Sequence, residues 1–99
     1  MIVYHDNGNI KEKGDRLSWT KKKMGHWQYF NENGKLLSEG KYWHDKRVGI
    51  WKYYHLDGSI HREGRYKRNF KVGHWHFFDH KGILTHKGNY DAYGLEDGV

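Results

Sequence analysis

Residues 49–72, GIWKYYHLDGSIHREGRYKRNFKV, decide the fold, because their pattern occurs three times in the chain at a spacing of 24 residues. Repetition at a fixed period of this length indicates repeat units that pack mainly against their neighbours. The recurring positions hold glycine, tryptophan or tyrosine: Gly25, Gly49 and Gly73; Trp27, Trp51 and Trp75; Gly34, Gly58 and Gly82; Gly40, Gly64 and Gly88; Tyr42, Tyr66 and Tyr90.

Each repeat has a turn signal at its middle, between two stretches rich in aromatic and β-branched residues. The signals are Asn33-Gly34, Asp57-Gly58 and Lys81-Gly82. Asn-Gly and Asp-Gly suit a two-residue type I′ turn, in which both central residues need a positive φ. Because Trp, Tyr, Phe and Ile favour strands, each repeat is predicted to form one β-hairpin with such a turn.

The turn fixes which residues face each other. With residues 57 and 58 in the turn, Trp51 pairs with Gly64 and Gly49 pairs with Tyr66. An aromatic ring can lie over the bare backbone of a glycine across the ladder, which explains an otherwise unfavourable glycine in a strand. We therefore expect an indole over its partner glycine in every repeat: Trp27 over Gly40, Trp51 over Gly64 and Trp75 over Gly88.

Alternation along the strands then divides the side chains between two faces. The face expected to pack carries Trp27, Tyr29, Leu36 and Tyr42; Trp51, Tyr53, Ile60 and Tyr66; Trp75, Phe77, Leu84 and Tyr90. The other face is polar with one aromatic residue per hairpin: His26, Gln28, Phe30, Glu39 and Lys41; Ile50, Lys52, Tyr54, Glu63 and Arg65; His74, His76, Phe78 and Lys87.

The predicted architecture is all-β: a single elongated, twisted antiparallel meander of about four β-hairpins, forming an open repeat sheet. The 99 residues make one repeat domain, with residues 1–24 as a degenerate capping unit followed by units 25–48, 49–72 and 73–99. Hydrophobic residues are 35% of the chain and aromatic residues 17%, which fits a thin sheet whose buried contacts come from large rings.

Composition also limits the function. The chain has no cysteine and no proline, and its N-terminus lacks the apolar run of a signal peptide, so we expect a cytoplasmic protein without a disulfide framework. No stretch approaches the ~20 apolar residues of a transmembrane helix. The net charge of +6 favours an acidic partner, although charge alone also keeps a thin sheet in solution.

We expect no catalytic residues, no metal site and no cofactor. His74 and His76 share a face and could bridge a metal, but no third ligand accompanies them. The serines have no histidine and carboxylate in a common register, as nucleophilic catalysis would require. Glu63 faces Lys52, so an ion pair across the strands is the ordinary interpretation.

The predicted contacts with a partner fall into two groups. Aromatic residues recur once per hairpin on the polar face beside basic neighbours, which favours a binding groove, although the rings could simply complete the packing. Basic residues also fill the spacers between hairpins and would line one long edge of the sheet. The first group is Tyr4, Phe30, Tyr54, Phe78, Lys41, Lys52 and Arg65, and the second is Lys21, Lys22, Lys23, Lys46, Arg47, Lys67, Arg68 and Lys71.

The order Gly-x-Trp, two aromatic residues, Asn/Asp-Gly and Glu-Gly-x-Tyr resembles the MORN repeat, most closely the variant of bacterial YwqK-type proteins, which are often labelled antitoxins. The matching stretches are GHWQYFNENGKLLSEGKY, GIWKYYHLDGSIHREGRY and GHWHFFDHKGILTHKGNY. This resemblance implies an open solenoid of hairpins and a binding or scaffolding role, with no catalytic residues to carry over. Lys87 departs from the pattern, since the other full repeats have glutamate there.

Three hypotheses for the partner follow. The first is a non-enzymatic module that binds an acidic protein and, in an antitoxin-like or inhibitor-like role, neutralises it. The second is peripheral binding of anionic phospholipid headgroups through the basic edge, and the third is binding of nucleic acid by the same charges. The terminal edge strands could also pair with another copy of the chain.

Overall fold

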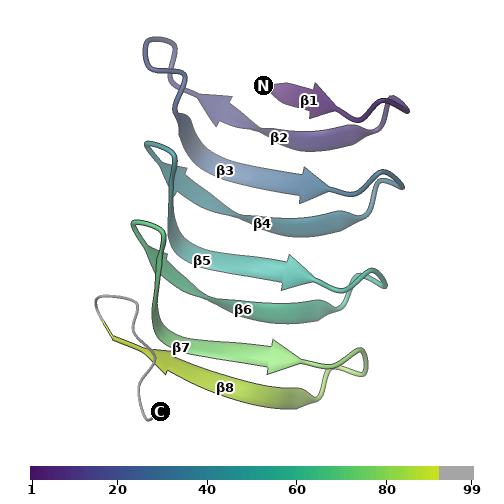
Figure 1. The fold of residues 1–99 in the computed structure, drawn as a ribbon, viewed down its shortest axis with the longest axis vertical. Helices are drawn as coiled ribbons and strands as arrows, with labels where there is room; N and C mark the ends of the chain where they lie inside the picture. Colours follow the sequence, from purple (N-terminus) through teal and green to yellow (C-terminus); the bar gives the residue numbers. More distant parts are fainter. Residues whose placement is uncertain (92–99) are drawn as a thin grey trace.

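The computed structural model describes residues 1–91, which form one antiparallel sheet of eight strands in sequence order (Figure 1). Each strand pairs with the next, so the chain is the predicted meander of hairpins. The strands are β1 (Ile2–Tyr4), β2 (Ile10–Arg16), β3 (Lys23–Phe30), β4 (Leu36–Trp43), β5 (Lys46–Tyr54), β6 (Ile60–Lys67), β7 (Phe70–Phe78) and β8 (Leu84–Tyr90).

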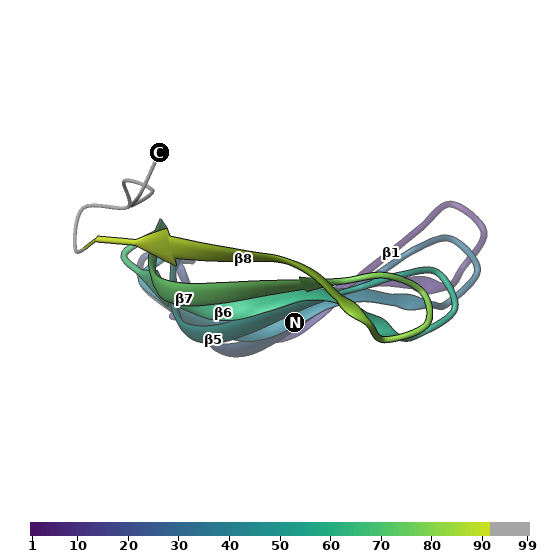
Figure 2. The same cartoon turned by 90° about the horizontal axis from the view of Figure 1, so that it is seen from below.

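The sheet is a single bowed layer, as the view along its length shows (Figure 2). Its principal extents are 42 × 34 × 15 Å. The all-β prediction is therefore confirmed, and no second layer of described residues covers either face. The last predicted unit, 73–99, includes residues 92–99, which lie outside the described residues.

The predicted register in the middle of each hairpin is confirmed. Trp51 pairs with Gly64, and Gly49 pairs with Tyr66, across β5 and β6. The hairpins β3–β4 and β7–β8 repeat this register, with Trp27 opposite Gly40 and Trp75 opposite Gly88. The three repeats thus have the same backbone pairing, as their sequence period requires.

The prediction of two-residue type I′ turns within the hairpins is wrong. In the third hairpin the His55 N–H donates to Ser59 O at 2.8 Å, and the Gly58 N–H donates to His55 O at 3.0 Å. Gly58 alone has a positive φ, of +91°. This is a three-residue loop, a type I turn followed by a left-handed glycine. The Asp57 carboxylate accepts from the Ser59 N–H at 2.9 Å, which holds the chain in this longer turn.

The extra loop residue moves three side chains to the other face. Beyond the shift between Tyr53 and Tyr54, Tyr54 pairs with Ile60. Directly opposed residues share a face, so Ile60 lies on the polar face and not on the packed face as predicted. The same shift moves Leu36 and Leu84, which pair with Phe30 and Phe78.

The two-residue turns occur instead between hairpins, where both central residues have positive φ: His44 and Asp45 at 50° and 69°, and Arg68 and Asn69 at 49° and 73°. The side chain in the second position reaches the preceding turn of the sheet. Asp45 accepts from the Lys23 N–H, and Asn69 from the Arg47 N–H, each at 2.7 Å. Backbone bonds of 3.0 Å return from Asp45 to Lys23 and from Asn69 to Arg47, so each turn is fastened to its neighbour.

The core is a row of three indoles, Trp27, Trp51 and Trp75, none more than 1% exposed, together with the buried Tyr66. Each indole covers a glycine, but not the glycine expected. Trp51 covers Gly40, and Trp75 covers Gly64, in the preceding hairpin.

The predicted indole–glycine contacts within each hairpin are therefore wrong. The ladders β4–β5 and β6–β7 shift register at Gly40 and Gly64, and these bulges let the rings reach back. The indole N–H groups donate to the same preceding strands, from Trp51 to Lys41 O at 2.9 Å and from Trp75 to Arg65 O at 3.1 Å. Each tryptophan therefore joins two hairpins.

Candidate functional site

The fold places the predicted partner-binding residues on three surfaces. The polar face carries the aromatic residues of the first group with Lys41, Lys52 and Arg65. The basic edge is the long side formed by the turns between hairpins, residues 17–22, 43–46 and 67–70, at the left in Figure 1. The Trp face is the side of the sheet that holds the three buried indoles.

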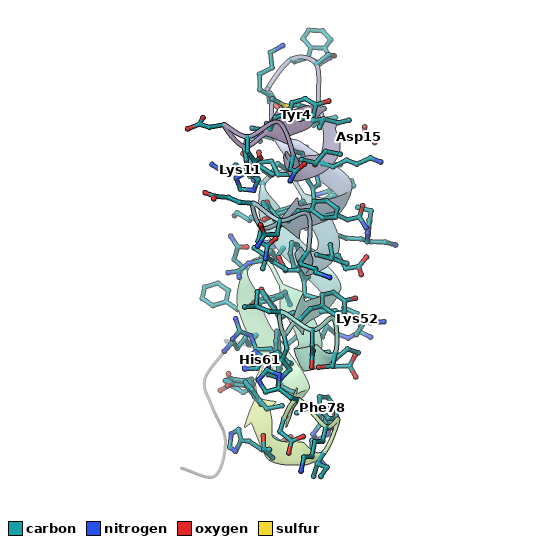
Figure 3. All side chains as sticks on the ribbon, turned by 90° about the vertical axis from the view of Figure 1, so that its right-hand side faces the viewer. Tyr4, Lys11, Asp15, Lys52, His61 and Phe78 are labelled. Carbon is teal, nitrogen blue, oxygen red and sulfur yellow. The ribbon has the colours of Figure 1, made fainter. Side chains whose placement is uncertain are left out.

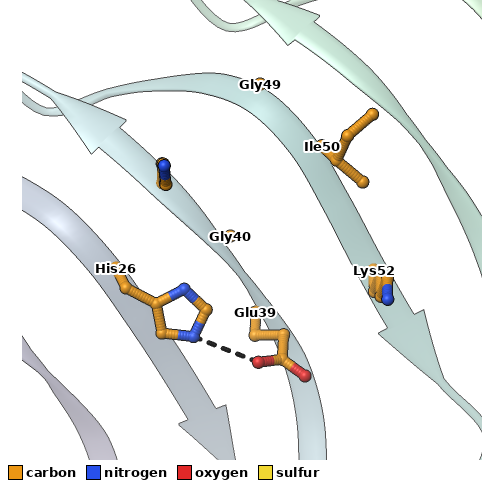
Figure 4. Close-up of a pocket in the computed structure, with 7 residues that line it drawn as sticks. His26, Glu39, Gly40, Gly49, Ile50 and Lys52 are labelled. Atoms are coloured by element: carbon orange, nitrogen blue, oxygen red, sulfur yellow. Dashed lines mark hydrogen bonds and ion pairs between the residues drawn. The ribbon is translucent and has the colours of Figure 1, made fainter.

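A shallow, open pocket of about 500 Å³ lies on the polar face between β3, β4 and β5 (Figure 4). Glu39 is its central group. The Glu39 carboxylate lies 3.0 Å from Nε2 of His26 and accepts a short hydrogen bond from the Tyr54 hydroxyl. Lys52 and the half-exposed Ile50 complete the pocket on β5.

Polar groups at this pocket are hydrogen-bonded to one another. Burial raises the pKa of Tyr54, and the hydrogen bond to Glu39 raises it further, so the phenol stays protonated and acts as a donor. Glu39 is already satisfied by two partners, and no serine or threonine lines the pocket. Lys52 pairs with Glu63 in register, but no ion pair within 4.0 Å joins them in residues 1–91.

The aromatic row of the polar face is only partly accessible. Tyr4 is 57% exposed at the end of β1 (Figure 3). Phe30, Tyr54 and Phe78 are half-buried, each opposite the aliphatic residue that the loop shift moved to this face. These three rings therefore contribute to packing, whereas Tyr4 offers most of its surface.

The predicted basic spacer residues divide into two sets. Lys23, Arg47 and Lys71 are half-buried and lie over the rings of the Trp face. The Lys23 ammonium is 4.9 Å from the Trp27 ring centroid, and Lys71 is 5.3 Å from that of Trp75. These positions are spaced 24 residues apart and lie four residues before each tryptophan, so strand alternation could have assigned them to the Trp face.

The other five spacer residues are exposed on the basic edge: Lys21, Lys22, Lys46, Lys67 and Arg68. Three large apolar side chains accompany them, Trp19, Trp43 and Phe70, which are 92%, 60% and 57% exposed. Sequence reasoning missed these three, although Trp19 and Trp43 also stand 24 residues apart. In the described chain, the only carboxylate among these turns is Asp45.

The opposite long edge has the reverse charge. Its four loops, residues 5–9, 31–35, 55–59 and 79–83, hold four carboxylates and two lysines: Asp6, Glu32, Asp57 and Asp79, with Lys35 and Lys81. Sequence reasoning did not single out this edge. The sheet therefore separates charge between its two long edges.

Three histidines gather at this acidic edge. The ring centroids of His55 and His80 are 4.1 Å apart, and those of His55 and His61 are 4.6 Å apart. His80 lies 3.5 Å from Asp57. Burial lowers the pKa of His61, and the charges of His55, Arg62 and His80 lower it further.

The histidine pair considered for a metal, His74 and His76, lies on the polar face. His74 is opposite Asn89, and His76 stacks on Phe78 with a centroid distance of 6.5 Å. Within residues 1–91 no group of three or more histidine, cysteine or carboxylate side chains is arranged to hold a metal ion.

A family model described as "MORN repeat variant" matches residues 1–15, 25–44 and 47–68, together more than half of the chain. The chain belongs to the MORN repeat variant family. The match covers the first three hairpins, β1 to β6, and leaves the bottom hairpin of Figure 1 outside it. No curated protein and no solved structure matches the chain. MORN repeats are typically non-enzymatic binding repeats.

Residues 1–91 include no helix that could span a lipid bilayer.

Proposed function

We propose that this MORN repeat chain is a non-enzymatic module that binds an acidic protein along its basic edge. The observation that supports it most directly is the separation of charge between the long edges. Five exposed cations and one carboxylate lie on the basic edge, whereas carboxylates outnumber lysines on the other. A partner with a negative surface is therefore attracted to one side of the sheet in one orientation.

The exposed rings of the basic edge give this attraction an apolar component. Trp19, Trp43 and Phe70 stand among the cations, and aromatic residues beside arginine and lysine are common at the energetic centres of protein interfaces. The partner would thus present carboxylates around an apolar patch. In the antitoxin-like version of this proposal, the partner is an enzyme or a toxin, and the chain inhibits it by covering this surface. We place the interaction in the cytoplasm, in keeping with a chain that has no cysteine.

The same composition favours a second candidate, the surface of an anionic membrane. Tryptophan is enriched at the membrane–water interface, and clustered lysines are attracted to anionic lipids. The acidic protein is our first choice because the two-sided charge pattern fixes an orientation as well as an attraction. Nucleic acid binding ranks third, since the edge offers five cations and its rings are irregularly placed along it.

A pair of charge-reversal variants tests the proposal. Lys46→Glu/Lys67→Glu alters the basic edge, and Lys35→Glu/Lys81→Glu makes the same change of charge on the acidic edge. Immobilised chains are incubated with a cell lysate at about 0.15 M salt. We expect the wild type and the acidic-edge variant to retain the same acidic proteins, and the basic-edge variant to lose them.

The competing ligands are measured in parallel. The wild type is floated with vesicles of phosphatidylcholine alone and of phosphatidylcholine with phosphatidylserine, and it is titrated with single-stranded DNA at several salt concentrations. Retention by anionic vesicles without any protein whose binding depends on Lys46 and Lys67 would replace the first candidate with the second. Equal retention of protein by both charge-reversal variants would remove the basic edge as the contact surface.

A further inference from the structure

The third hairpin carries a pair of tyrosines between two arginines on the Trp face. The hydroxyls of Tyr53 and Tyr66 are 2.9 Å apart. The Arg47 guanidinium lies over the Tyr66 ring and the Arg62 guanidinium over the Tyr53 ring, each 4.2 Å from the ring centroid. Two guanidinium groups and two phenols thus form one contiguous cluster.

The free hydrogen-bonding groups of the two arginines are all donors. Arg47 Nη1 donates to Tyr53 and Tyr66 at 3.3 and 3.1 Å, and its Nε donates to Asn69 Oδ1 at 3.0 Å, which leaves the Nη2 hydrogens free. One of the two phenolic hydrogens serves the Tyr53–Tyr66 bond, and the other is free. Burial raises the pKa of Tyr66, and its bond to Tyr53 adds to this, so the Tyr66 phenol stays protonated.

Arg62 has no acceptor at all in the described part of the chain. Its Nε is buried without a hydrogen-bond partner, and no carboxylate lies within 4.0 Å of either arginine in residues 1–91. Leaving a charged donor without an acceptor lowers stability. The positive charges of Arg47 and Arg62 also repel each other. An anion bound between them would offset this repulsion and accept hydrogen bonds from both arginines.

The repeat does not need this second arginine. The residue that corresponds to Arg62 is Ser38 in the second hairpin and His86 in the fourth. The second hairpin keeps the same fold with a Tyr29–Tyr42 pair and the single cation Lys23, whose ammonium donates to Tyr29 at 2.8 Å. The two-arginine arrangement is therefore a local addition to the scaffold.

We propose that Arg47, Arg62 and the Tyr53–Tyr66 pair form a binding site for an oxyanion, a carboxylate or a phosphate group. The oxyanion accepts charge-assisted hydrogen bonds from Arg62 and from Nη2 of Arg47, and a further bond from the free phenolic hydrogen. Stacking on the rings holds the guanidinium planes in place before the ligand arrives. This site is on the Trp face, and it does not depend on which partner binds the basic edge.

NMR of the arginine Nε–H groups in the full chain tests the proposal. The wild type is titrated with sodium phosphate and, separately, with sodium acetate, at constant ionic strength maintained with sodium chloride. We expect the Arg62 and Arg47 signals to shift saturably with at least one oxyanion, at millimolar concentration, and not with chloride. The oxyanion that saturates identifies the group as phosphate or carboxylate.

Three variants make the test specific. Arg62→Ser, which copies the residue of the second hairpin, should weaken the titration about tenfold or more, the loss expected for a charged hydrogen-bonding partner. Arg65→Ser removes an exposed arginine of the polar face and should leave the titration unchanged. Lys23→Arg/Ser38→Arg/Asp45→Asn copies the site into the second hairpin, with an asparagine in the place of Asn69 beside Arg47, and should add a second set of saturable shifts.

Two results would overturn the site. One is a wild-type response to phosphate and acetate no larger than the response to chloride. The other is an equal loss of oxyanion affinity in Arg62→Ser and Arg65→Ser, which would show that the binding depends only on the net charge of the chain. Should Arg62→Ser fail to fold, the copied site decides: a folded Lys23→Arg/Ser38→Arg/Asp45→Asn variant that shows no second set of shifts contradicts the proposal.

Discussion

Replacing Gly64 with alanine tests the central packing contact of the fold. A Cβ at this position would lie well within 3.0 Å of three ring atoms of Trp75, closer than real Cβ atoms approach their neighbours. Trp75 is fully buried, and its N–H is fixed to Arg65 O at 3.1 Å. The indole therefore cannot stay in place when the methyl group is added.

The size of the effect follows from three contributions. An alanine that fits its site stabilises by about 0.4–1 kcal/mol relative to glycine, through the unfolded chain. Overpacking costs about 1–3 kcal/mol where the core can shift. Complete loss of a buried tryptophan costs about 3–5 kcal/mol, which sets the upper limit. We expect Gly64→Ala to lower the free energy of unfolding by about 2–4 kcal/mol.

Gly88→Ala is the matched control. Gly88 occupies the same place in its hairpin, opposite Trp75, but no described indole covers it. Its added Cβ would meet Tyr90 at 3.1 Å, a contact that a shift of a few tenths of an ångström relieves. We expect its free energy of unfolding to change by less than about 1 kcal/mol.

Urea unfolding followed by tryptophan fluorescence measures both variants. If each indole covered the glycine of its own hairpin, Gly88→Ala would be as harmful as Gly64→Ala, and equal losses would refute the contact between hairpins. If Gly64→Ala does not fold, Trp75→Leu/Gly64→Ala is compared with Trp75→Leu alone. With the indole gone the added methyl group should cost nothing more.

Three further predictions concern titration and turns. The pKa of His61 is lowered in the fold, so the unfolded chain binds more protons, and stability should fall as pH drops from about 6.5 through the folded pKa. His61→Gln should flatten this dependence in thermal melts at pH 5–7.5, and an unchanged slope would contradict it. Asn69→Gly keeps the backbone permissive but removes the 2.7 Å bond from the Arg47 N–H, and should lose about 1 kcal/mol in urea unfolding; no loss would show that the turn needs no fastening. Tyr54→Phe should remove, from an absorbance titration, a phenol that ionises above the usual value of about 10, because Tyr54 is partly buried and bonded to Glu39. If the phenol lost in Tyr54→Phe instead has the usual pKa, Tyr54 is not in this partly buried, hydrogen-bonded environment.

The hairpin repeat and its central register could be predicted because they depend on spacing alone. Glycine and tryptophan recur in phase, and one turn position then fixes the pairs from Gly49–Tyr66 to Tyr53–Arg62. The loop type could not be fixed in the same way. Asp-Gly suits both a two-residue type I′ turn and a three-residue turn with a left-handed glycine. The Asp57 side chain, which bonds to the Ser59 N–H, selects the second.

The sequence could not predict which glycine lies under each indole, for a different reason. Gly40 lies 13 residues after Trp27 and 11 before Trp51, and the 24-residue period keeps both relations in every full repeat. Strand pairing therefore favours the hairpin's own glycine, while the bulge at Gly40 turns the ring of Trp51 towards it. A bulge depends on backbone geometry between hairpins, and nothing in the spacing marks it.

The candidate surfaces were only partly predictable because neighbouring basic residues have opposite roles. Lys46 is exposed on the basic edge, whereas Arg47, the next residue, lies over Tyr66 on the Trp face. Residues 1–91 form no second layer over the rings, and cations with long apolar stems cover the rings instead. A run of positive charge in this repeat therefore cannot be assigned as a whole to partner binding. Lys23, Arg47 and Lys71 stabilise the aromatic face, and only the exposed basic residues of the spacers are placed to attract a partner.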